Sequence, residues 1–269
     1  MADKTGISWT DSTFNPWMGC AKVSPGCDHC YAEVSTPSRT MRIVWGPQEA
    51  RRKTSVSNWG QPVRWNAAHA HFFVQHERRR RVFCASLADV FDNRADPTWR
   101  AELWALVGAT PHLDWLLLTK RIGNVAGMLP ADWGDGYPNV WLGISVVNQA
   151  EVERDVPKLL ATPAQMRWLS MEPLLEPVSF EGLFANPNRT CDGTNALEEI
   201  DWVVVGGESG ANARPIPVGA VESIRDQCAA VDVPFFFKQW GGTSKDKGGC
   251  TLDGMEVKAW PRQHGCRGG

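Results

Sequence analysis

The stretch DWLLLTKR, residues 114–121, is an apolar run that ends in a threonine and two basic residues. Runs of the same form recur from residue 82 onward: RVFCAS (81–86), VWLGISV (140–146), MRWLSMEP (166–173), DWVVVGGES (201–209) and PFFFKQW (234–240). Short apolar runs rich in β-branched or aromatic residues are typical of strands buried on both faces. Each run therefore predicts one strand of a buried sheet.

Candidate helices alternate with these strands, at residues 97–109, 148–161 and 217–231. Such alternation builds a parallel sheet with right-handed crossovers, either a barrel or an open doubly wound sheet. Polar residues follow nearly every apolar run: Ser86, Asp89, Lys120, Arg121, Ser145, Asn148, Ser170, Glu172, Glu208, Lys238 and Gln239. A barrel brings these positions to one mouth, whereas an open sheet spreads them along a crevice. We therefore predict an α/β fold, a parallel (β/α) barrel, partial or complete and TIM-like.

The remaining segments are assigned around this barrel. TFNPWMGC (13–20) is the predicted first strand, and a helix is expected to begin near Tyr31. Residues 44–80 lack clear strand periodicity, so they form a predicted insertion after the first βα unit. We expect a catalytic domain over residues 1–240 and an irregular C-terminal cap over the Gly- and Lys-rich residues 241–269.

Composition indicates where the protein works. The chain has 269 residues, 43% of them hydrophobic, which is enough for one domain with a full core. It contains no apolar run of about 18 residues to span a bilayer, and its N-terminus lacks the features of a secretory signal. We expect a cytoplasmic protein with no membrane partner, in which the eight cysteines are reduced thiols rather than disulfides.

Three cysteines are clustered in MGCAKVSPGCDHCYAE, residues 18–33, with the spacing C-x6-C-x2-C. The close pair lies on one tight turn, and the spacer with Pro25-Gly26 lets the chain fold back to deliver the third thiol, so Cys20, Cys27 and Cys30 are predicted metal ligands. Soft thiolates select zinc, copper(I) or an iron–sulfur cluster. Structural zinc needs a fourth ligand, for which His29, His69, His71 and His76 are candidates. A 4Fe–4S cluster held by three cysteines instead leaves one iron open for substrate or cofactor.

The other cysteines are dispersed. Cys84 and Cys228 lie in apolar patterns and are expected to be buried small hydrophobes. Cys191, Cys250 and Cys266 lie in polar stretches, and their roles stay open.

Basic residues are locally concentrated although the net charge is −2. The runs Arg51–Lys53 and Arg78–Arg81 are candidate phosphate contacts, with a solvated face as the alternative. Three tryptophans of the insertion, Trp45, Trp59 and Trp65, are candidate stacking platforms for bases. These features favour nucleic acid or a nucleotide as the substrate.

The cysteine loop, with His29 just before the last cysteine, resembles the radical S-adenosylmethionine superfamily, although the usual spacing there is C-x3-C-x2-C. The whole chain is similar to a phage-associated three-cysteine-motif family that is regarded as radical S-adenosylmethionine-like. The stretches that carry this resemblance are ISWTDSTFNPWMGCAKVSPGCDHCYAE, FCASLADVFD, WLLLTKR, WLGISVVNQ, WLSMEPLLEP, DWVVVGGESG, PFFFKQWGG and TLDG.

The resemblance implies that the three cysteines ligate a 4Fe–4S cluster whose open iron binds S-adenosylmethionine. One-electron reduction by a flavodoxin- or ferredoxin-type donor then gives a 5′-deoxyadenosyl radical, which takes hydrogen from a substrate. It also implies the host cytoplasm if the protein is phage-encoded. Modification or repair of nucleic acid or a nucleotide is the expected outcome.

Site roles follow from the strand ends and the resemblance together. The predicted cofactor contacts are His29, Tyr31, Ser86, Asp89 and Ser145, and the predicted catalytic residues are Glu172, Lys120 and Glu208. The Gly-Gly-Glu sequence at residues 206–208 lies at a late strand, so it is expected to face substrate rather than cofactor. The alternatives are a surface salt bridge for each charged residue, a zinc-stabilised nucleic-acid-binding protein without catalysis, and a hydrolase or lyase that uses only the carboxylates.

Overall fold

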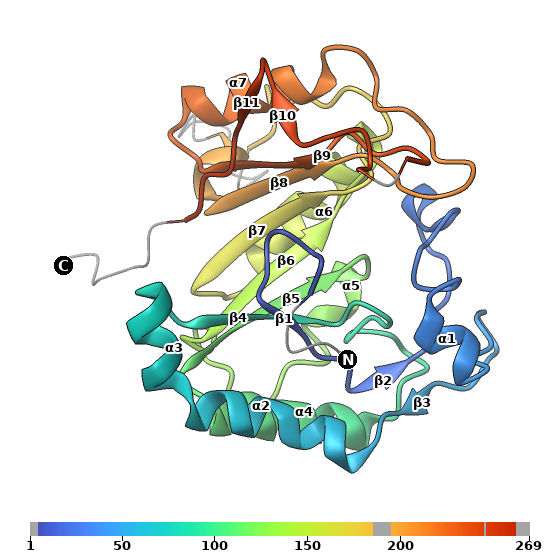
Figure 1. The fold of residues 1–269 in the computed structure, drawn as a ribbon. Helices are drawn as coiled ribbons and strands as arrows, with labels where there is room; N and C mark the ends of the chain where they lie inside the picture. Colours follow the sequence, from blue (N-terminus) through green and yellow to red (C-terminus); the bar gives the residue numbers. More distant parts are fainter. Residues whose placement is uncertain (1–4, 185–194, 245, 262–269) are drawn as a thin grey trace, which may run out of the picture. The chain divides into compact units, whose positions relative to one another are not determined.

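A computed structural model describes residues 5–184, 195–244 and 246–261 of the chain (Figure 1). It contains two compact units. The first comprises Met1–Ser145 and Lys158–Met166, and the second comprises Val146–Pro157 and Arg167–Gly269. The predicted division into a domain over 1–240 and a cap from 241 stays a prediction.

A parallel sheet forms the core of the first unit. Its strands are β1 (Ser12–Thr13), β4 (Arg80–Cys84), β5 (Leu113–Thr119) and β6 (Val140–Ser145), adjacent in that order. Every adjacent pair is parallel, with Val82 opposite Trp115 and Leu117 opposite Leu142. Trp115 and Leu117 are fully buried, as the apolar run around them predicts.

Helices of the first unit follow its strands. α4 (Pro97–Ala109) lies between β4 and β5, as predicted, and α5 (Ile122–Val125) follows β5. Asp96 begins α4 because its carboxylate accepts the backbone N–H of Thr98 at 2.8 Å, and Pro97 occupies the first helical turn. Because the parallel strands share one direction, the loops after β4 and β5 emerge at the same edge of the sheet.

The segment predicted as the first strand, residues 13–20, is wrong as a single strand. Only Ser12–Thr13 pairs with the main sheet, whereas β2 (Trp17–Met18) pairs antiparallel with β3 (Arg52–Lys53). Pro16 separates the two pieces and has no N–H to donate to a ladder. The helix expected near Tyr31 is also wrong, since η1 (Pro25–Cys27) comes first and α1 (Thr36–Thr40) begins after the Ser35 cap.

The predicted insertion over residues 44–80 contains β3 and two helices. α2 (Val56–Ala67) begins where the Ser55 side chain accepts the N–H of Asn58, and α3 (His69–His76) ends at Glu77 in the left-handed conformation. α3 ends just before β4 begins, so it approaches the sheet from the start of the strands.

The second unit has its own parallel strands, β7 (Met166–Met171), β8 (Trp202–Gly206) and β9 (Phe235–Gln239), adjacent in that order. The predicted helices are present as α6 (Gln149–Ala161), which crosses the boundary between the units at Pro157, and α7 (Ala220–Ala230). Trp202 is central to its core, with ring centroids 5.4 Å from Trp168 and 4.9 Å from Trp260. A 3-10 turn, η2 (Ala196–Glu199), precedes β8.

The tail predicted as an irregular cap contains a short hairpin, β10 (Thr251–Leu252) and β11 (Met255–Glu256). Beyond it the chain runs along β9, because the Phe237 N–H donates to the Val257 carbonyl at 2.8 Å and the Ala259 N–H to the Phe235 carbonyl at 3.0 Å. The tail therefore extends the second unit's sheet at its edge.

The predicted α/β class with parallel strands is confirmed, and a partial or complete barrel stays a prediction. Cys84 and Cys228 are fully buried, as expected. Cys191 and Cys266 lie outside the described residues. Within the described ranges, no helix combines the length and the apolarity needed to cross a membrane.

Candidate active site

The cysteine loop of the first unit is attached to the segment that follows β4. The Gly19 N–H donates to the Leu87 carbonyl at 3.1 Å, and the Tyr31 hydroxyl donates to the Ser86 carbonyl at 3.1 Å. Asn15 adds a third link, because its side-chain oxygen accepts the Leu87 N–H at 2.7 Å and its amide donates to the Ser86 hydroxyl at 3.0 Å. The loop thus lies at the carboxyl end of the parallel strands, where active sites of such folds are built.

The three thiols differ in their surroundings. Cys20 contacts the Ala21 carbonyl at 3.5 Å, and Cys27 is buried in η1. Cys30 packs against the small apolar cluster of Met18, Ala32 and Leu87. Burial, reinforced by the charge of Asp89, raises the pKa of Cys20 to about 12. Burial also raises the pKa of Cys30 while the Lys120 ammonium opposes this, so both groups are neutral thiols at pH 7.

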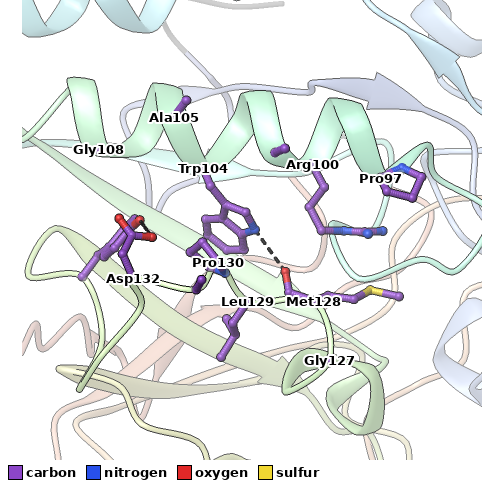
Figure 2. Close-up of a pocket in the computed structure, with 13 residues that line it drawn as sticks. Pro97, Arg100, Trp104, Ala105, Gly108, Gly127, Met128, Leu129, Pro130 and Asp132 are labelled. Carbon is purple, nitrogen blue, oxygen red and sulfur yellow. Dashed lines mark hydrogen bonds between the residues drawn. The ribbon is translucent and has the colours of Figure 1, made fainter.

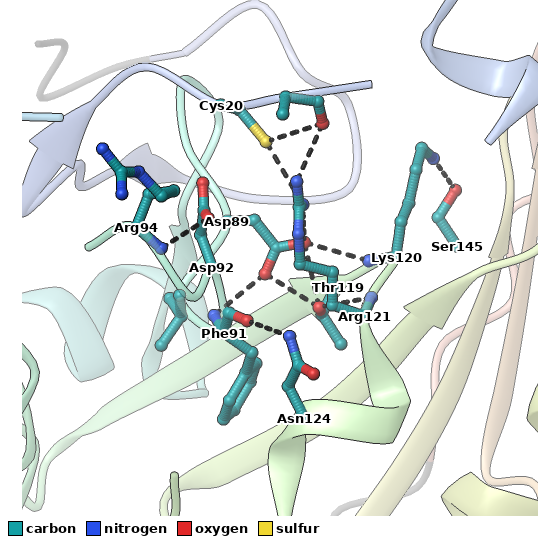
Figure 3. A network of polar contacts seen from close by, with 12 residues as sticks. Cys20, Asp89, Phe91, Asp92, Arg94, Thr119, Lys120, Arg121, Asn124 and Ser145 are labelled. Carbon is teal, nitrogen blue, oxygen red and sulfur yellow. Dashed lines mark hydrogen bonds and ion pairs between the residues drawn. The ribbon is translucent and has the colours of Figure 1, made fainter. Parts of the chain in front are cut away.

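Asp89 is the centre of a buried polar network just after β4 (Figure 3). Its carboxylate accepts the Thr119 hydroxyl at 2.8 and 3.0 Å, the Lys120 N–H at 3.1 Å and the Phe91 N–H at 2.9 Å. It also pairs with Arg121 Nη1 at 3.0 Å. These donors fix the end of β5 to the loop after β4. The Asp89 carboxylate is therefore occupied by donors of the protein itself, and its predicted contact with a cofactor stays a prediction.

Two cations at the end of β5 face the cysteine loop. Arg121 Nη1 lies 3.3 Å from Cys20 Sγ, and its Nη2 donates to the Ala21 carbonyl at 2.8 Å. The Lys120 ammonium donates to the Ser145 hydroxyl at the end of β6 and is close enough to Cys30 to influence its charge (Figure 3). The thiols and a local positive potential thus occupy one side of the first unit.

The predicted residues of the second unit form two ion pairs at strand ends. Glu172 accepts Lys238 Nζ at 2.6 Å and the Ser170 hydroxyl at 3.2 Å. Glu208 accepts Arg214 through three donors, at 2.8, 2.9 and 3.1 Å. Both carboxylates are therefore held by cations of their own unit.

The structure places the predicted site residues in two groups. Cys20, Cys27, Cys30, His29, Tyr31, Ser86, Asp89, Lys120 and Ser145 belong to the first unit, and Glu172 and Glu208 to the second. His29 is exposed between Cys27 and Cys30, and the Tyr31 hydroxyl donates to the Ser86 carbonyl. Sequence reasoning missed Asn15, and it gave Arg121 no role beyond that of a polar strand-end residue. The position of Arg121 directly after Lys120 was the available signal.

The residues of the basic run Arg78–Arg81 have partners within the first unit. Arg78 pairs with both oxygens of Asp11 at 2.6 and 2.8 Å, and Arg79 lies 3.8 Å from Asp114. Arg80 lies over the Phe72 ring at 4.5 Å, and Arg81 is 6% exposed over Trp141. The run also begins β4, whereas the thiols lie beyond its end, roughly 16 Å away along five residues of strand.

The other basic run and the tryptophans of the insertion also have partners within the first unit. Arg51 is buried, with Nε 2.7 Å from Asp92, and Lys53 pairs with Glu102. Arg52 is exposed and donates to the Met41 carbonyl at 2.7 Å. Trp45 packs against the cluster under Cys30, Trp59 packs edge-on to Phe14 with centroids 5.6 Å apart, and Trp65 is buried.

A fourth ligand from α3 is excluded by position. His69 stacks on His112 with centroids 3.7 Å apart, and His112 directly precedes β5, so this pair lies at the start of the strands. In the part of the chain that the structure describes, no three His, Cys, Asp or Glu side chains are close enough to hold a metal ion. As they lie, the three thiols therefore do not form a site for a single metal ion.

An open groove of about 710 Å³ lies away from these residues, between α4 and residues 127–137 (Figure 2). Trp104 forms part of its wall and donates from Nε1 to the Met128 carbonyl at 3.0 Å. None of the predicted site residues lines it. The candidate site is therefore defined by its chemistry and not by this groove.

Residues 4–261 match one protein family, described as "Protein of unknown function (DUF5131)". The chain belongs to this family. No curated protein matches it. A Cys-to-Ser mutant of spore photoproduct lyase is similar in structure, with a TM-score of 0.47, 13% identity and coverage of 84% of this chain. A mutant of the same lyase with bound AdoMet and dinucleoside spore photoproduct gives a TM-score of 0.40, 13% identity and 72% coverage. The chain spans 63% and 55% of these two proteins, less than two thirds of their length.

Proposed function

We propose that the protein is a radical S-adenosylmethionine-type enzyme, with Cys20, Cys27 and Cys30 as ligands of a 4Fe–4S cluster. One observation carries the proposal: three thiols on a single loop lie at the carboxyl end of a parallel sheet, opposite the cations Lys120 and Arg121. A thiolate-held cluster and a carboxylate-bearing cofactor are both anionic, so cations at this position stabilise them.

The three donor atoms are of the chemical type that ligates an iron–sulfur cluster. All three donors are soft sulfurs, and Cys27 and Cys30 are close enough for their charges to interact. His69 and the other α3 imidazoles lie at the far end of the strands, which leaves three thiols without a fourth protein ligand from that helix. Three ligands suit a cluster with one open iron better than a closed structural zinc site.

Bound there, the cluster and S-adenosylmethionine would supply one-electron radical chemistry toward a substrate. The protein's own residues bind and orient these groups. Lys120, whose ammonium has the neutral Ser145 hydroxyl as a partner, provides a positive charge for the carboxylate of the cofactor. Asp89 keeps Lys120 and Arg121 in place through the end of β5. Burial of Cys27 limits access of water to the thiol side of the site.

The proposal assigns no substrate class, because most of the arginines and tryptophans that favoured nucleic acid have partners within the first unit. The catalytic roles of Glu172 and Glu208 stay predictions. The barrel also stays a prediction, one in which the carboxyl ends of all the parallel strands share one mouth.

The test is anaerobic purification, followed by reconstitution with iron and sulfide. We expect brown protein with sulfur-to-iron charge-transfer absorption, about four irons per chain, and reductive cleavage of S-adenosylmethionine to 5′-deoxyadenosine, measured by mass spectrometry. Colourless protein that carries one zinc and no iron would instead support the zinc alternative and contradict the proposal.

Matched variants separate the cluster ligands from other thiols. Cys27→Ala is expected to lose iron loading, because it removes one of the three ligands. Cys228→Ala, which removes a buried thiol of α7 in the second unit, is expected to load iron like the wild type. Full iron loading of Cys27→Ala would overturn the ligand assignment.

A further inference from the structure

The guanidinium group of Arg121 is largely buried and has a hydrogen-bond partner on each terminal nitrogen. Its side chain is 9% exposed, and Nη1 is shared between Asp89 Oδ2 at 3.0 Å and Cys20 Sγ at 3.3 Å. Nη2 reaches the Ala21 carbonyl at 2.8 Å, and the backbone N–H donates to the Thr119 hydroxyl at 2.9 Å. Figure 3 shows this group between the carboxylate and the sulfur.

The charges around this group reinforce one another. Burial alone lowers the pKa of Arg121, but the charges of Asp89 and Asp92 and the hydrogen bond to Cys20 outweigh it and raise the pKa, so the guanidinium stays charged. A planar guanidinium presents its donors in a rigid fork. Arg121 can therefore donate to Cys20 Sγ and to the Ala21 carbonyl at the same time. The fork therefore fixes both the position and the electrostatic environment of Cys20.

We propose that Arg121 is a positioning residue for Cys20 and that its N–H donor raises the reduction potential of the cluster held there. The inference rests on the proposed function. Hydrogen bonds and positive charge at a ligand sulfur stabilise the reduced state, which carries one more electron. Without Arg121, the Asp89 carboxylate faces Cys20 with its negative charge uncompensated, and the reduced state becomes harder to form.

The experiment is a redox titration of the reconstituted holoenzyme with dithionite as the one-electron donor, followed by electron paramagnetic resonance. Arg121→Gln is expected to shift the midpoint potential to a more negative value. Arg121→Lys keeps the charge but loses the fork, so its potential is expected between those of Arg121→Gln and the wild type. Arg64→Gln, at an exposed arginine of α2, is the matched control and is expected to leave the potential unchanged.

The potential separates this role from simple support of the loop. If Arg121 only stabilised the fold, Arg121→Gln would lower the melting temperature and leave the potential unchanged, and that result overturns the inference. If Arg121→Gln does not fold, Arg121→Lys decides, because a potential equal to that of the wild type overturns the inference. If the wild type itself takes up no cluster, the proposed function fails, which is distinct from an Arg121 variant that loads with an unchanged potential.

Discussion

Asp114, the first residue after the start of β5, gives a pH dependence that can be worked out from the structure. Its side chain is 6% exposed, and its Oδ2 is buried without a hydrogen-bond partner among the described residues. Burial raises the pKa of Asp114 from 3.8 to about 6, although the nearby Arg79, Arg81 and Arg78 charges oppose the shift. Arg79, 3.8 Å away and 45% exposed, is too well solvated to offset the burial.

The direction of the change in unfolding free energy with pH depends on which state, folded or unfolded, binds the Asp114 proton more tightly. The folded state binds the Asp114 proton better than the unfolded state does, so the stabilising contribution is complete below about pH 4 and is lost as the pH rises to about 6. A shift of about 2 units at about 1.4 kcal/mol each corresponds to about 3 kcal/mol. The wild type is thus expected to lose that amount of unfolding free energy across this window through Asp114.

The assay is urea unfolding, followed by tryptophan fluorescence and circular dichroism, from pH 4 to pH 7. Asp114→Asn removes the titrating group, so the difference between its unfolding free energy and that of the wild type should change by about 3 kcal/mol over this range. Asp11→Asn is the control. Burial raises the pKa of Asp11, but its bonds from Arg78 and Arg81 lower it overall, so its contribution is lost only as the pH falls below about 4. If the difference in unfolding free energy between Asp114→Asn and the wild type does not change with pH, the raised pKa of Asp114 is refuted.

Two further substitutions test other parts of the structure. Arg78→Ala removes the paired contacts to Asp11 and is expected to lower the unfolding free energy by about 1–2 kcal/mol, with no change in nucleic-acid affinity measured by fluorescence anisotropy. A large loss of affinity would restore the phosphate role. Gly207→Ala drives a Cβ into the Trp240 carbonyl group and should cost about 3 kcal/mol or more in urea unfolding. Gly123→Ala meets open space and is the control, and equal stability of the two variants would contradict the expected clash.

The strands were predictable because their signal is local. Each apolar run from residue 81 to residue 240 overlaps one of the strands β4–β9, and no partner has to be known to interpret such a run. The prediction of the first strand was wrong because only Ser12 and Thr13 pair with the sheet, and two residues are too few to show an alternating hydrophobic pattern. Residues 13–20 look like a strand in composition, but Pro16 separates Thr13, which pairs with the main sheet, from Trp17 and Met18, which pair with β3.

The partners of the charge runs could not be predicted because they are distant in sequence. Arg78 meets Asp11, and Arg51 meets Asp92, across 67 and 41 residues. A run of basic residues therefore looks like a free patch until the fold is known, whereas here Arg51, Lys53, Arg78 and Arg79 each have a carboxylate partner. The same limit applies to the thiols, since spacing predicts that Cys27 and Cys30 share a turn but not that Cys20 faces Arg121.

Strand-end polarity located the candidate site but could not assign roles within it. Thr119, Lys120 and Arg121 are consecutive, yet Thr119 donates to Asp89, Lys120 contacts Ser145, and Arg121 contacts Cys20. A parallel strand delivers its last residues to a common edge, but each side chain leaves the strand in its own direction and meets a different loop. Asp89 shows the consequence: as a carboxylate at a strand end it looks like a cofactor ligand, while its buried hydrogen bonds make it the anchor of the residues that face the thiols.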